Sequence, residues 1–269
     1  MSVLVVIPAR AGSVRLPMKP LRTIAGVSLL HRTIAFARRS LAAIDGVRLV
    51  VATDDLRIVA HAEAMDCPAV MTDSDITSGS GRALAAARSE ERTPACVVNL
   101  QGDAPFQPED ALPAVICALA DRRMDVATPV VRLTWAALDA LRAHKSVAPF
   151  SGTTCVRASD GRALWFSKAI VPAIRDEAGI RAAGLPCPIW RHVGIYGYRL
   201  DALEAFEAAE PTQLETLEGL EQLRLLELGL RIDAVEVAPA PFDISGIDTA
   251  ADIARAEALI AAHGDPHGA

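Results

Sequence analysis

The first 21 residues constrain the fold of this chain more than any other segment. An uninterrupted apolar run, Val3–Ile7, is typical of a strand that is buried on both faces, as in a parallel sheet. It ends at Pro8 and opens into a loop with three cations and two small residues, namely Arg10, Arg15, Lys19, Gly12 and Ser13. A buried strand that delivers such a loop to a sheet edge is how α/β folds hold a polyphosphate. The alternative, a basic surface loop after an edge strand, is disfavoured because three nearby cations repel one another unless an anion lies among them.

Apolar β-branched runs alternate with helical stretches through the first half of the chain. Strands are predicted at 47–52, 69–71, 95–100 and 126–131, and helices at about 55–64 and 109–119. This order favours an α/β fold with a Rossmann-like, mainly parallel sheet flanked by helices. The rhythm then changes, with strands at 153–157, 163–166 and 189–198, a long helix at about 215–228, a strand at 232–237 and a last helix at about 249–262. We expect a single domain over 1–269, in which about 150–200 contribute a smaller antiparallel lobe.

Composition argues against several classes of function. The 269 residues are 51% hydrophobic, enough for a sizeable core, and the net charge of −6 argues against broad binding of nucleic acid or anionic membranes. No apolar stretch approaches the roughly 18 residues of a membrane span, and the start lacks the basic region of a signal peptide. The cysteines indicate reduced, cytoplasmic thiols without a zinc site, because they are odd in number and scattered, at positions 67, 96, 117, 155 and 187.

Two aspartates are candidate ligands of a metal ion. Asp103 follows the strand at 95–100, and open α/β sheets bind ligands beyond the carboxyl ends of their strands. Mg²⁺ takes one or two carboxylates together with substrate phosphates, so Asp103 is placed to hold it, with a turn or helix cap as the alternative. For Asp248, spacing alone favours a cap of the final helix, since Thr249-x-x-Asp252 resembles a capping box. A capping carboxylate keeps a free oxygen, so the two roles are compatible.

Three other segments carry polar groups suited to a small ligand. The loop 77–82 is rich in small residues, ends in a cation, and could approach a base or phosphate by its backbone. His192, Tyr196 and Tyr198 share one face of a strand, although a lone buried histidine is equally often a satisfied core residue. Glu221 and Gln222 lie about 100° apart on a helix, where the alternative is an exposed helix face. The sequence fingerprints of ATPase P-loops and of dinucleotide-binding folds are absent.

Eight segments match one known family, in order and along nearly the whole chain. They are Ile7-Pro-Ala-Arg-Ala-Gly-Ser-Val-Arg-Leu-Pro-Met-Lys-Pro-Leu21, Ala52-Thr-Asp54, Ser78-Gly79, Val98-Asn-Leu-Gln-Gly-Asp103, Leu164-Trp-Phe-Ser-Lys168, Arg191-His-Val-Gly-Ile-Tyr-Gly-Tyr-Arg199, Leu217-Glu-Gly-Leu-Glu-Gln-Leu-Arg224 and Gly246-Ile-Asp-Thr249. In these segments the chain resembles the CMP-Kdo synthetases, which are 3-deoxy-manno-octulosonate (Kdo) cytidylyltransferases. The shared order over this length argues against chance.

The resemblance implies a cytoplasmic, Mg²⁺-dependent homodimer with a nucleotidyltransferase sheet and an antiparallel dimerisation lobe, which joins CTP to a sugar acid for lipopolysaccharide biosynthesis. By resemblance, the nucleotide would be held by Ala9, Arg10, Ser13, Lys19, Ser78 and Gln101, and Mg²⁺ by Asp103 and Asp248. The sugar acid would face His192, Tyr196, Glu221 and Gln222, with Arg175 and Arg191 as candidates for its carboxylate. Lys19, Arg10 and Asp103 are the expected catalytic residues, and neither nucleic acid nor membrane is expected as a partner.

The chain departs from the family pattern at a few positions. Ile76 and Gly81 stand where the family usually has a histidine and an acid, and Ala104 stands in place of a glutamate. Thr153-Thr154 replaces a Val-Lys pair, and Lys168 replaces an arginine. By resemblance these changes alter the sugar-acid side, so the acceptor is Kdo or another acidic sugar, such as a sialic-acid-like or amino-Kdo compound. A non-catalytic nucleotide-binding homologue is the alternative from a different class.

Overall fold

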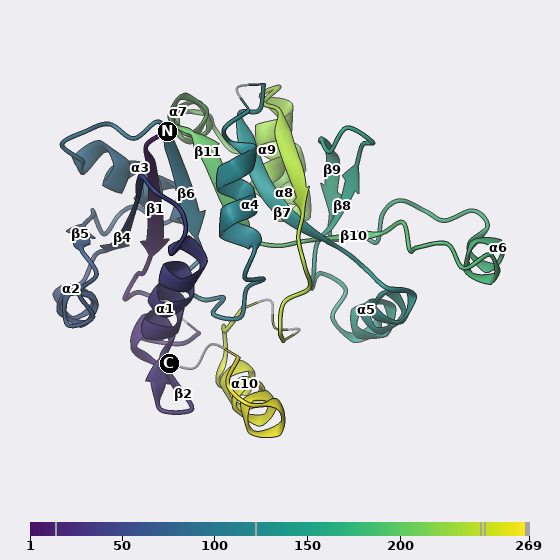
Figure 1. Cartoon of the computed structure of the whole chain (residues 1–269), viewed down its shortest axis with the longest axis horizontal. Helices are drawn as coiled ribbons and strands as arrows, with labels where there is room; N and C mark the ends of the chain where they lie inside the picture. Colours follow the sequence, from purple (N-terminus) through teal and green to yellow (C-terminus); the bar gives the residue numbers. More distant parts are fainter. Residues whose placement is uncertain (14, 122, 243, 245, 267–269) are drawn as a thin grey trace.

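One mixed sheet with helices on both faces forms the body of the molecule (Figure 1). The structure is a computed structural model that describes residues 1–13, 15–121, 123–242, 244 and 246–266. Within these residues, ten strands form the sheet in the order β5-β4-β1-β6-β11-β7-β10-β8-β9, and β12 also pairs with β7. The predicted α/β class is confirmed. No helix among these residues is long and apolar enough to cross a membrane.

The parallel part of the sheet brings three loops to one edge. It consists of the strands β5 (Ala69–Met71), β4 (Val47–Thr53), β1 (Val3–Pro8) and β6 (Cys96–Leu100). In register, Pro8 lies beside Ala52 and Val6 beside Asn99, so the loops that follow β1, β4 and β6 leave the sheet together. Open α/β sheets bind ligands beyond the carboxyl ends of their strands, so a ligand is expected at this edge.

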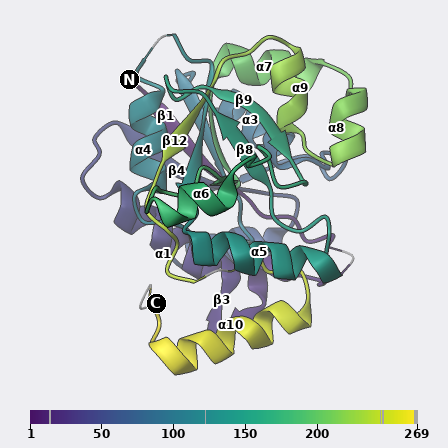
Figure 2. The same cartoon turned by 90° about the vertical axis from the view of Figure 1, so that its right-hand side faces the viewer.

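Side chains of β1 alternate between two apolar cores, one on each face of the sheet. Val3, Val5 and Ile7 pack with helices α1 (Leu29–Leu41), α2 (Leu56–Glu63) and α4 (Ala111–Ala118). Leu4 and Val6 pack on the other face, where the core includes residues of α3 (Gly79–Ser89), α7 (Leu200–Ala208) and α9 (Gln222–Glu227). Figure 2 shows α1 and α4 on one side of the strands and α3, α7 and α9 on the other. Burial on both faces explains the uninterrupted apolar run.

The strand β7 (Val126–Arg132) joins this part of the sheet to an antiparallel part. Along one edge it pairs in parallel with β12 (Ile232–Glu236). Its other edge pairs first with β11 (Ile195–Arg199) and then with β10 (Trp190–His192), both antiparallel. The strands β8 (Thr154–Arg157) and β9 (Ala163–Ser167) extend the sheet, with α5 (Trp135–Val147) and α6 (Glu177–Ala182) nearby (Figure 1).

Two predicted elements are each broken in the structure. The strand expected at 189–198 is two strands, β10 and β11, separated at 193–194. The helix expected at 215–228 is two short helices, α8 (Gln213–Glu218) and α9. Gly219 ends α8 in the left-handed region, at φ 63°, and a continuous helix cannot pass through that conformation.

The C-terminal segment returns to the loop that follows β1. The single-turn helix η1 (Lys19–Leu21) and the hairpin of β2 (Thr23–Ile24) and β3 (Val27–Ser28) continue from that loop, and α10 (Ala250–His263) packs against β2. A separate apolar cluster joins the two ends of the chain and includes Leu16, Ile24, Leu29, Phe106, Phe242, Ile244, Ile247 and Ala256. Thr249 caps α10 in a capping box with Asp252, as predicted. The preceding residue, Asp248, is thereby placed beside the N-terminal loop.

Candidate active site

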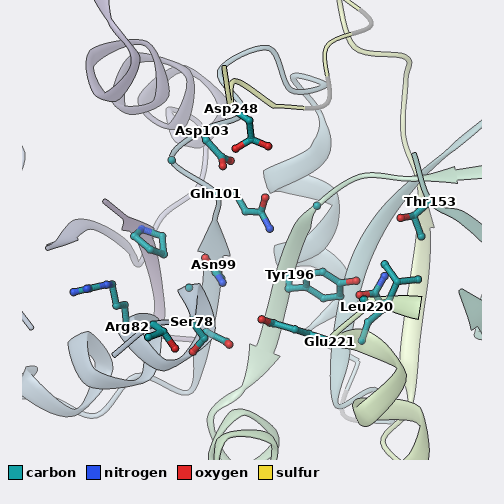
Figure 3. Close-up of a pocket in the computed structure, with 18 of the residues that line it drawn as sticks. Ser78, Arg82, Asn99, Gln101, Asp103, Thr153, Tyr196, Leu220, Glu221 and Asp248 are labelled. Atoms are coloured by element: carbon teal, nitrogen blue, oxygen red, sulfur yellow. The ribbon is translucent and has the colours of Figure 1, made fainter. Parts of the chain in front are cut away.

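A cavity of about 710 Å³ opens at the carboxyl edge of the parallel strands and extends to the antiparallel part of the sheet. One side is lined by residues that were predicted to hold the nucleotide or Mg²⁺, and we call it the nucleotide side after that prediction: Ala9, Arg10, Ser13, Lys19, Ser78, Gln101, Asp103 and Asp248. The other is lined by residues that were predicted to face the sugar acid, and we call it the sugar side: Arg191, His192, Tyr196, Glu221 and Gln222. Figure 3 shows the two aspartates at one end, with Ser78 and Arg82 across the cavity from Tyr196 and Glu221. Arg175 is exposed between β9 and α6 and lies outside this lining.

The loop after β1 is anchored by a buried ion pair. Asp54 accepts a hydrogen bond from the backbone N–H of Ala11 at 3.0 Å and pairs with Arg82 at 2.6 Å through its other oxygen. Arg82 is 2% exposed, so the pair lies behind the loop and fixes its path. Arg10 donates to the carbonyl of Thr77 at 3.2 Å. The two polar loops at this edge, after β1 and before α3, are thus held together as one wall.

Asp103 and Asp248, from opposite ends of the chain, converge on a single ammonium group. Lys19 Nζ lies 2.6 Å from Asp103 Oδ2 and 2.8 Å from Asp248 Oδ1. Arg15 reaches the second oxygen of Asp248 at 3.1 Å. The backbone helps to hold the two aspartates together, because the N–H of Ile247 donates to the carbonyl of Asp103 at 2.8 Å. The two aspartates that the resemblance assigns to one Mg²⁺ therefore lie together, as that assignment requires.

Gly102 allows the loop after β6 to pass close to the end of β1. A Cβ atom at Gly102 would lie 2.7 Å from the carbonyl oxygen of Pro8, so only glycine fits there without a shift of backbone. Gln101 projects beside Gly194, where a Cβ would lie 3.3 Å from its side-chain oxygen. Ser78 caps α3 by accepting from the N–H of Gly81 at 2.9 Å. These close approaches fix the floor of the cavity.

A ladder of aromatic rings forms the wall on the sugar side. Ring centroids are 5.3 Å apart for Phe166 and His192, 5.2 Å for His192 and Tyr196, and 5.9 Å for Tyr196 and Tyr198. The shared face predicted for His192, Tyr196 and Tyr198 is therefore confirmed, despite the break in the strand. Burial lowers the pKa of His192 to about 3, with a further contribution from the positive charge of Lys168, and burial raises the pKa of both tyrosines. The wall is uncharged at neutral pH.

Glu221 and Gln222 face the cavity from the start of α9. Gln222 is 6% exposed, whereas Glu221 is open to the cavity and surrounded by protein. The protein around this carboxylate removes part of its water, and this desolvation, together with the nearby carboxylate of Glu207, raises the pKa of Glu221. The alternative of an exposed helix face does not hold for Gln222, because the turn at Gly219 directs the start of α9 into the cavity.

Lys168 is a lining residue that the sequence analysis named only as a departure from the family pattern. Its ammonium donates to Thr153 Oγ1 at 3.3 Å, and its backbone N–H donates to Glu218 at 2.8 Å. Burial lowers the pKa of Lys168, although Glu218 opposes this shift. Together with Arg191 it gives the sugar side two cations. Asp54 and Arg82 were also missed as a structural pair, although the loop at 77–82 was singled out for its terminal cation.

Four departures from the family pattern, at Ile76, Gly81, Ala104 and Thr154, are outside the lining of the cavity. Thr154 is fully buried and donates to the carbonyl of Ala169 at 2.7 Å. At Gly81, a Cβ would lie 2.7 Å from Ser78 Oγ and 3.0 Å from the Glu207 carboxylate. Substitutions at these positions would therefore act on the ligand through neighbouring residues.

The chain is similar to known proteins over nearly its whole length. A family model described as Cytidylyltransferase matches residues 4–232. A 3-deoxy-manno-octulosonate cytidylyltransferase of Maricaulis maris (strain MCS10) is 42% identical, over 98% of this chain and 99% of the relative. Proteins of the same name from Chelativorans sp. (strain BNC1) and Xanthomonas oryzae pv. oryzae are 39% and 42% identical, over 97% and 96% of this chain and 98% and 95% of the relatives.

Solved structures give the same result for the fold. A CMP:2-keto-3-deoxy-manno-octonic acid synthetase complexed with CTP superposes with a TM-score of 0.80 at 31% identity, over 97% of this chain and 99% of that chain. A cytidylyltransferase from Leptospira borgpetersenii serovar Hardjo-bovis has a TM-score of 0.57 at 17% identity, over 97% of this chain and 87% of that chain. The second likeness extends to the fold alone.

Proposed function

The chain belongs to the 3-deoxy-manno-octulosonate cytidylyltransferase family, and on this premise we propose that it transfers the cytidylyl group of CTP to a 3-deoxy-2-keto sugar acid. Kdo is the acceptor proposed first, because the relatives carry its name. One observation carries the proposal: the group of Lys19, Asp103 and Asp248 shares a single cavity with a wall of hydrogen-bonding side chains. A triphosphate and a polyhydroxylated acid can therefore meet there.

The transfer needs positioning and neutralisation of charge more than covalent catalysis. The anomeric oxygen of the acid forms a bond to the α-phosphorus of CTP, the bond to the β-phosphate oxygen breaks, and the hydroxyl proton passes to water. Lys19 and Arg10 line the nucleotide side, where their charges would stabilise the leaving pyrophosphate. Ser13, Ser78, Gln101 and the backbone at Ala9 would position the nucleotide.

Mg²⁺ is part of the proposal. Among the described residues no group of three or more His, Cys, Asp or Glu side chains could hold a metal ion by itself. Two carboxylates suffice for Mg²⁺, which completes its shell with water and substrate phosphates. Asp103 and Asp248 are close enough together that both contact the ammonium of Lys19. When bound, the ion would polarise the phosphoryl oxygens and favour ionisation of the attacking hydroxyl.

The sugar side would bind the acid by charge and by hydrogen bonds. Lys168 and Arg191 line this side and are suited to the carboxylate of the acid. Arg191 was predicted for this role, and the position of Arg175 outside the cavity makes it the weaker candidate. The uncharged wall and Gln222 offer partners for hydroxyl groups, and a site built in this way discriminates strongly against analogues that lack them.

The proposal is tested by measuring pyrophosphate release from CTP with Kdo, 8-amino-Kdo and a nine-carbon sialic acid. We expect activity with at least one of them, and a fall in turnover of roughly 10²-fold or more for Asp103→Asn, which removes a principal charge stabiliser. Binding of CTP is measured separately. CTP binding without transfer to any of the acids would reject these acceptors, and wild-type turnover in Asp103→Asn would remove that residue from the metal site.

A cytoplasmic homodimer completes the proposed function. Supporting the dimer, several large apolar side chains are exposed in the antiparallel part of the chain, namely Val147, Phe150, Leu164 and Leu185. Supporting the reducing compartment, the cysteines are unpaired. Light scattering in line with size-exclusion chromatography measures the mass directly, and Phe150→Asp should shift a dimer toward the monomer. A wild-type mass of one chain at micromolar concentration would contradict the dimer.

A further inference from the structure

We propose that Thr128 is a positioning residue that holds His192 as the Nε2–H tautomer, so that Nδ1 accepts a hydrogen bond from a donor group of the acceptor sugar. The assignment of the donor to the sugar rests on the proposed function. The tautomer itself follows from hydrogen bonds within the protein and can be tested without any substrate.

The hydroxyl of Thr128 has partners of two kinds. Thr128 lies in β7, is fully buried, and spans the break between β10 and β11. Its Oγ1 lies 2.8 Å from the carbonyl oxygen of Ile195, 3.3 Å from that of Val193, and 3.0 Å from Nε2 of His192. Carbonyl oxygens only accept hydrogen bonds, and the contact with the carbonyl of Ile195 is the shortest of the three, so we assign the single hydroxyl proton to it. The hydroxyl oxygen is then the acceptor for Nε2, which must carry a proton.

A neutral imidazole has one N–H group. The pKa of His192 is lowered to about 3 by burial and by the positive charge of Lys168, so the ring is neutral at physiological pH. With the proton on Nε2, Nδ1 has a free lone pair. Among the described residues, Thr128 is the hydrogen-bond partner of the imidazole, and His192 is one of the residues that line the cavity. Nδ1 is therefore available to a ligand.

The ring is fixed in its plane as well as in its protonation. Phe166 meets it edge-on, with an interplanar angle of 78°, and Tyr196 packs against it at 44°. The backbone N–H of His192 donates to the carbonyl of Thr153 at 2.9 Å, which holds the end of β10 to the residue before β8. An acceptor held in this way selects a hydroxyl or ammonium group over a carbonyl or carboxylate oxygen at the same position. His192 is then a specificity residue and is not a general base.

The tautomer is measured by ¹⁵N NMR of the wild-type protein, with the resonance of His192 assigned through His192→Gln. We expect the pattern of an Nε2–H tautomer that does not titrate between about pH 5 and 8. Thr128→Val keeps the shape but removes the hydroxyl and should shift the ring toward the Nδ1–H form. Thr128→Ser keeps the hydroxyl and should preserve the wild-type pattern.

Kinetics give the second measurement. For Thr128→Val the KM of the sugar acid should rise roughly tenfold, as expected for the loss of one oriented hydrogen bond, while the KM of CTP is unchanged. Thr128→Ser should stay within about threefold of the wild type. The pair Ser28 and His61 provides the matched control: it is a hydroxyl–imidazole contact at 2.7 Å, outside the cavity. Ser28→Ala should leave the KM of the sugar acid and the His192 resonance unchanged.

An Nδ1–H tautomer in the wild-type protein overturns the inference, even if Thr128→Val does not fold. An unchanged KM of the sugar acid in a folded Thr128→Val variant, with the tautomer shifted, overturns the role in acceptor binding. Failure of the wild-type protein to transfer the cytidylyl group would instead reject the proposed function, and the NMR result for Thr128 would stand separately.

Discussion

Lys19 separates two carboxylates that would otherwise repel each other at close range. The side chain of Lys19 is 12% exposed, and its ammonium contacts both Asp103 and Asp248. Without the lysine the two carboxylates would present an uncompensated double negative charge to the cavity. The ammonium of Lys19 thus occupies the position between the carboxylates that would suit a metal ion. A free metal ion must therefore compete with Lys19 for the two carboxylates.

Replacing Lys19 should therefore have opposite effects on metal binding and on turnover. For Lys19→Met we expect the affinity for Mg²⁺ in the absence of nucleotide to rise about tenfold, a modest value because both carboxylates are partly exposed. Turnover should fall, since the charge that stabilises pyrophosphate is lost. Calorimetry measures the first effect and pyrophosphate release the second. Arg22→Met is the control from the same loop, and equal Mg²⁺ affinity in wild type and Lys19→Met would contradict this account.

The buried imidazole of His192 makes stability depend on pH. Its pKa in the folded protein, about 3, lies below the ordinary value near 6.5. Between these pH values the imidazole is therefore protonated in the unfolded chain and neutral in the folded protein. The free energy of unfolding should consequently fall as the pH falls from about 6.5. His192→Gln should reduce this slope by up to about 1.4 kcal/mol per pH unit. Urea unfolding at several pH values measures it, and equal slopes in both proteins would show that His192 does not contribute.

At the scale of single residues, the sequence predicts that Asp103 and Asp248 belong to one site, but it does not predict every side chain that contacts them. The end of an apolar strand placed Asp103 at the sheet edge, and the capping box fixed Asp248 one residue before Thr249, the N-cap of α10. The contact of Lys19 with both aspartates could not be read from the sequence, since it depends on the path of a loop closed by distant segments. Thr128 was missed because a threonine within a strand is an ordinary β-former and carries no separate signal.

Short interruptions of the secondary structure place the sugar side of the site. Gly219 ends α8, and Gly194 lies between β10 and β11 next to Gln101. Apolar residues continue with helical spacing across Gly219, which is why the sequence favoured one long helix over 215–228. The glycine was the available signal, because it is the residue that most often ends a helix in the left-handed region. The parallel strands were predicted well because burial on both faces leaves an unmistakable apolar run.

Gly219→Ala tests the importance of the turn between α8 and α9. Both Gly219 and Gly229 have positive φ, at 63° and 76°, and a Cβ at either would meet no atom within 4 Å. Each alanine variant should lose about 1–2 kcal/mol of stability from the strained backbone alone. The variant at 219 should also raise the KM of the sugar acid several-fold, because Glu221 and Gln222 follow directly. The variant at 229 is the matched control, and an equal effect of both on this KM would refute the role of the turn.

Across the whole molecule, the two ends of the chain meet behind Asp103 and Asp248, the proposed ligands of Mg²⁺. The apolar cluster that includes Phe106 and Phe242, whose rings lie 5.1 Å apart, supports the segment that leads to Asp248. The buried Arg32 adds an ion pair with Asp265 at 2.7 Å. The geometry of the two carboxylates therefore depends on packing between residues more than 100 positions apart, which no local sequence pattern reports.

Phe242→Ala should weaken both stability and the use of Mg²⁺. Phe242 is 7% exposed, and its truncation should cost about 3 kcal/mol. Because this cluster supports the segment that leads to Asp248, its loss should displace that carboxylate. The Mg²⁺ concentration for half-maximal activity should therefore rise several-fold. Leu138→Ala is the control, since Leu138 is fully buried in a different cluster and should cost a similar amount of stability. If both variants needed the same Mg²⁺ concentration as the wild type, the proposed coupling would be wrong.

The strand β7 joins the parallel and antiparallel parts of the sheet, and the cavity is lined from both parts. This division bears on how such an enzyme can acquire a new acceptor during evolution. The lining residues proposed to face the nucleotide come from residues 8–103 and from Asp248, whereas those proposed to face the acceptor come from residues 152–225. A change of acceptor can therefore arise from substitutions within one continuous stretch of the gene, with the chemistry for CTP left intact. Exchange of that stretch between relatives is accordingly a rational route to enzymes that activate new acidic sugars.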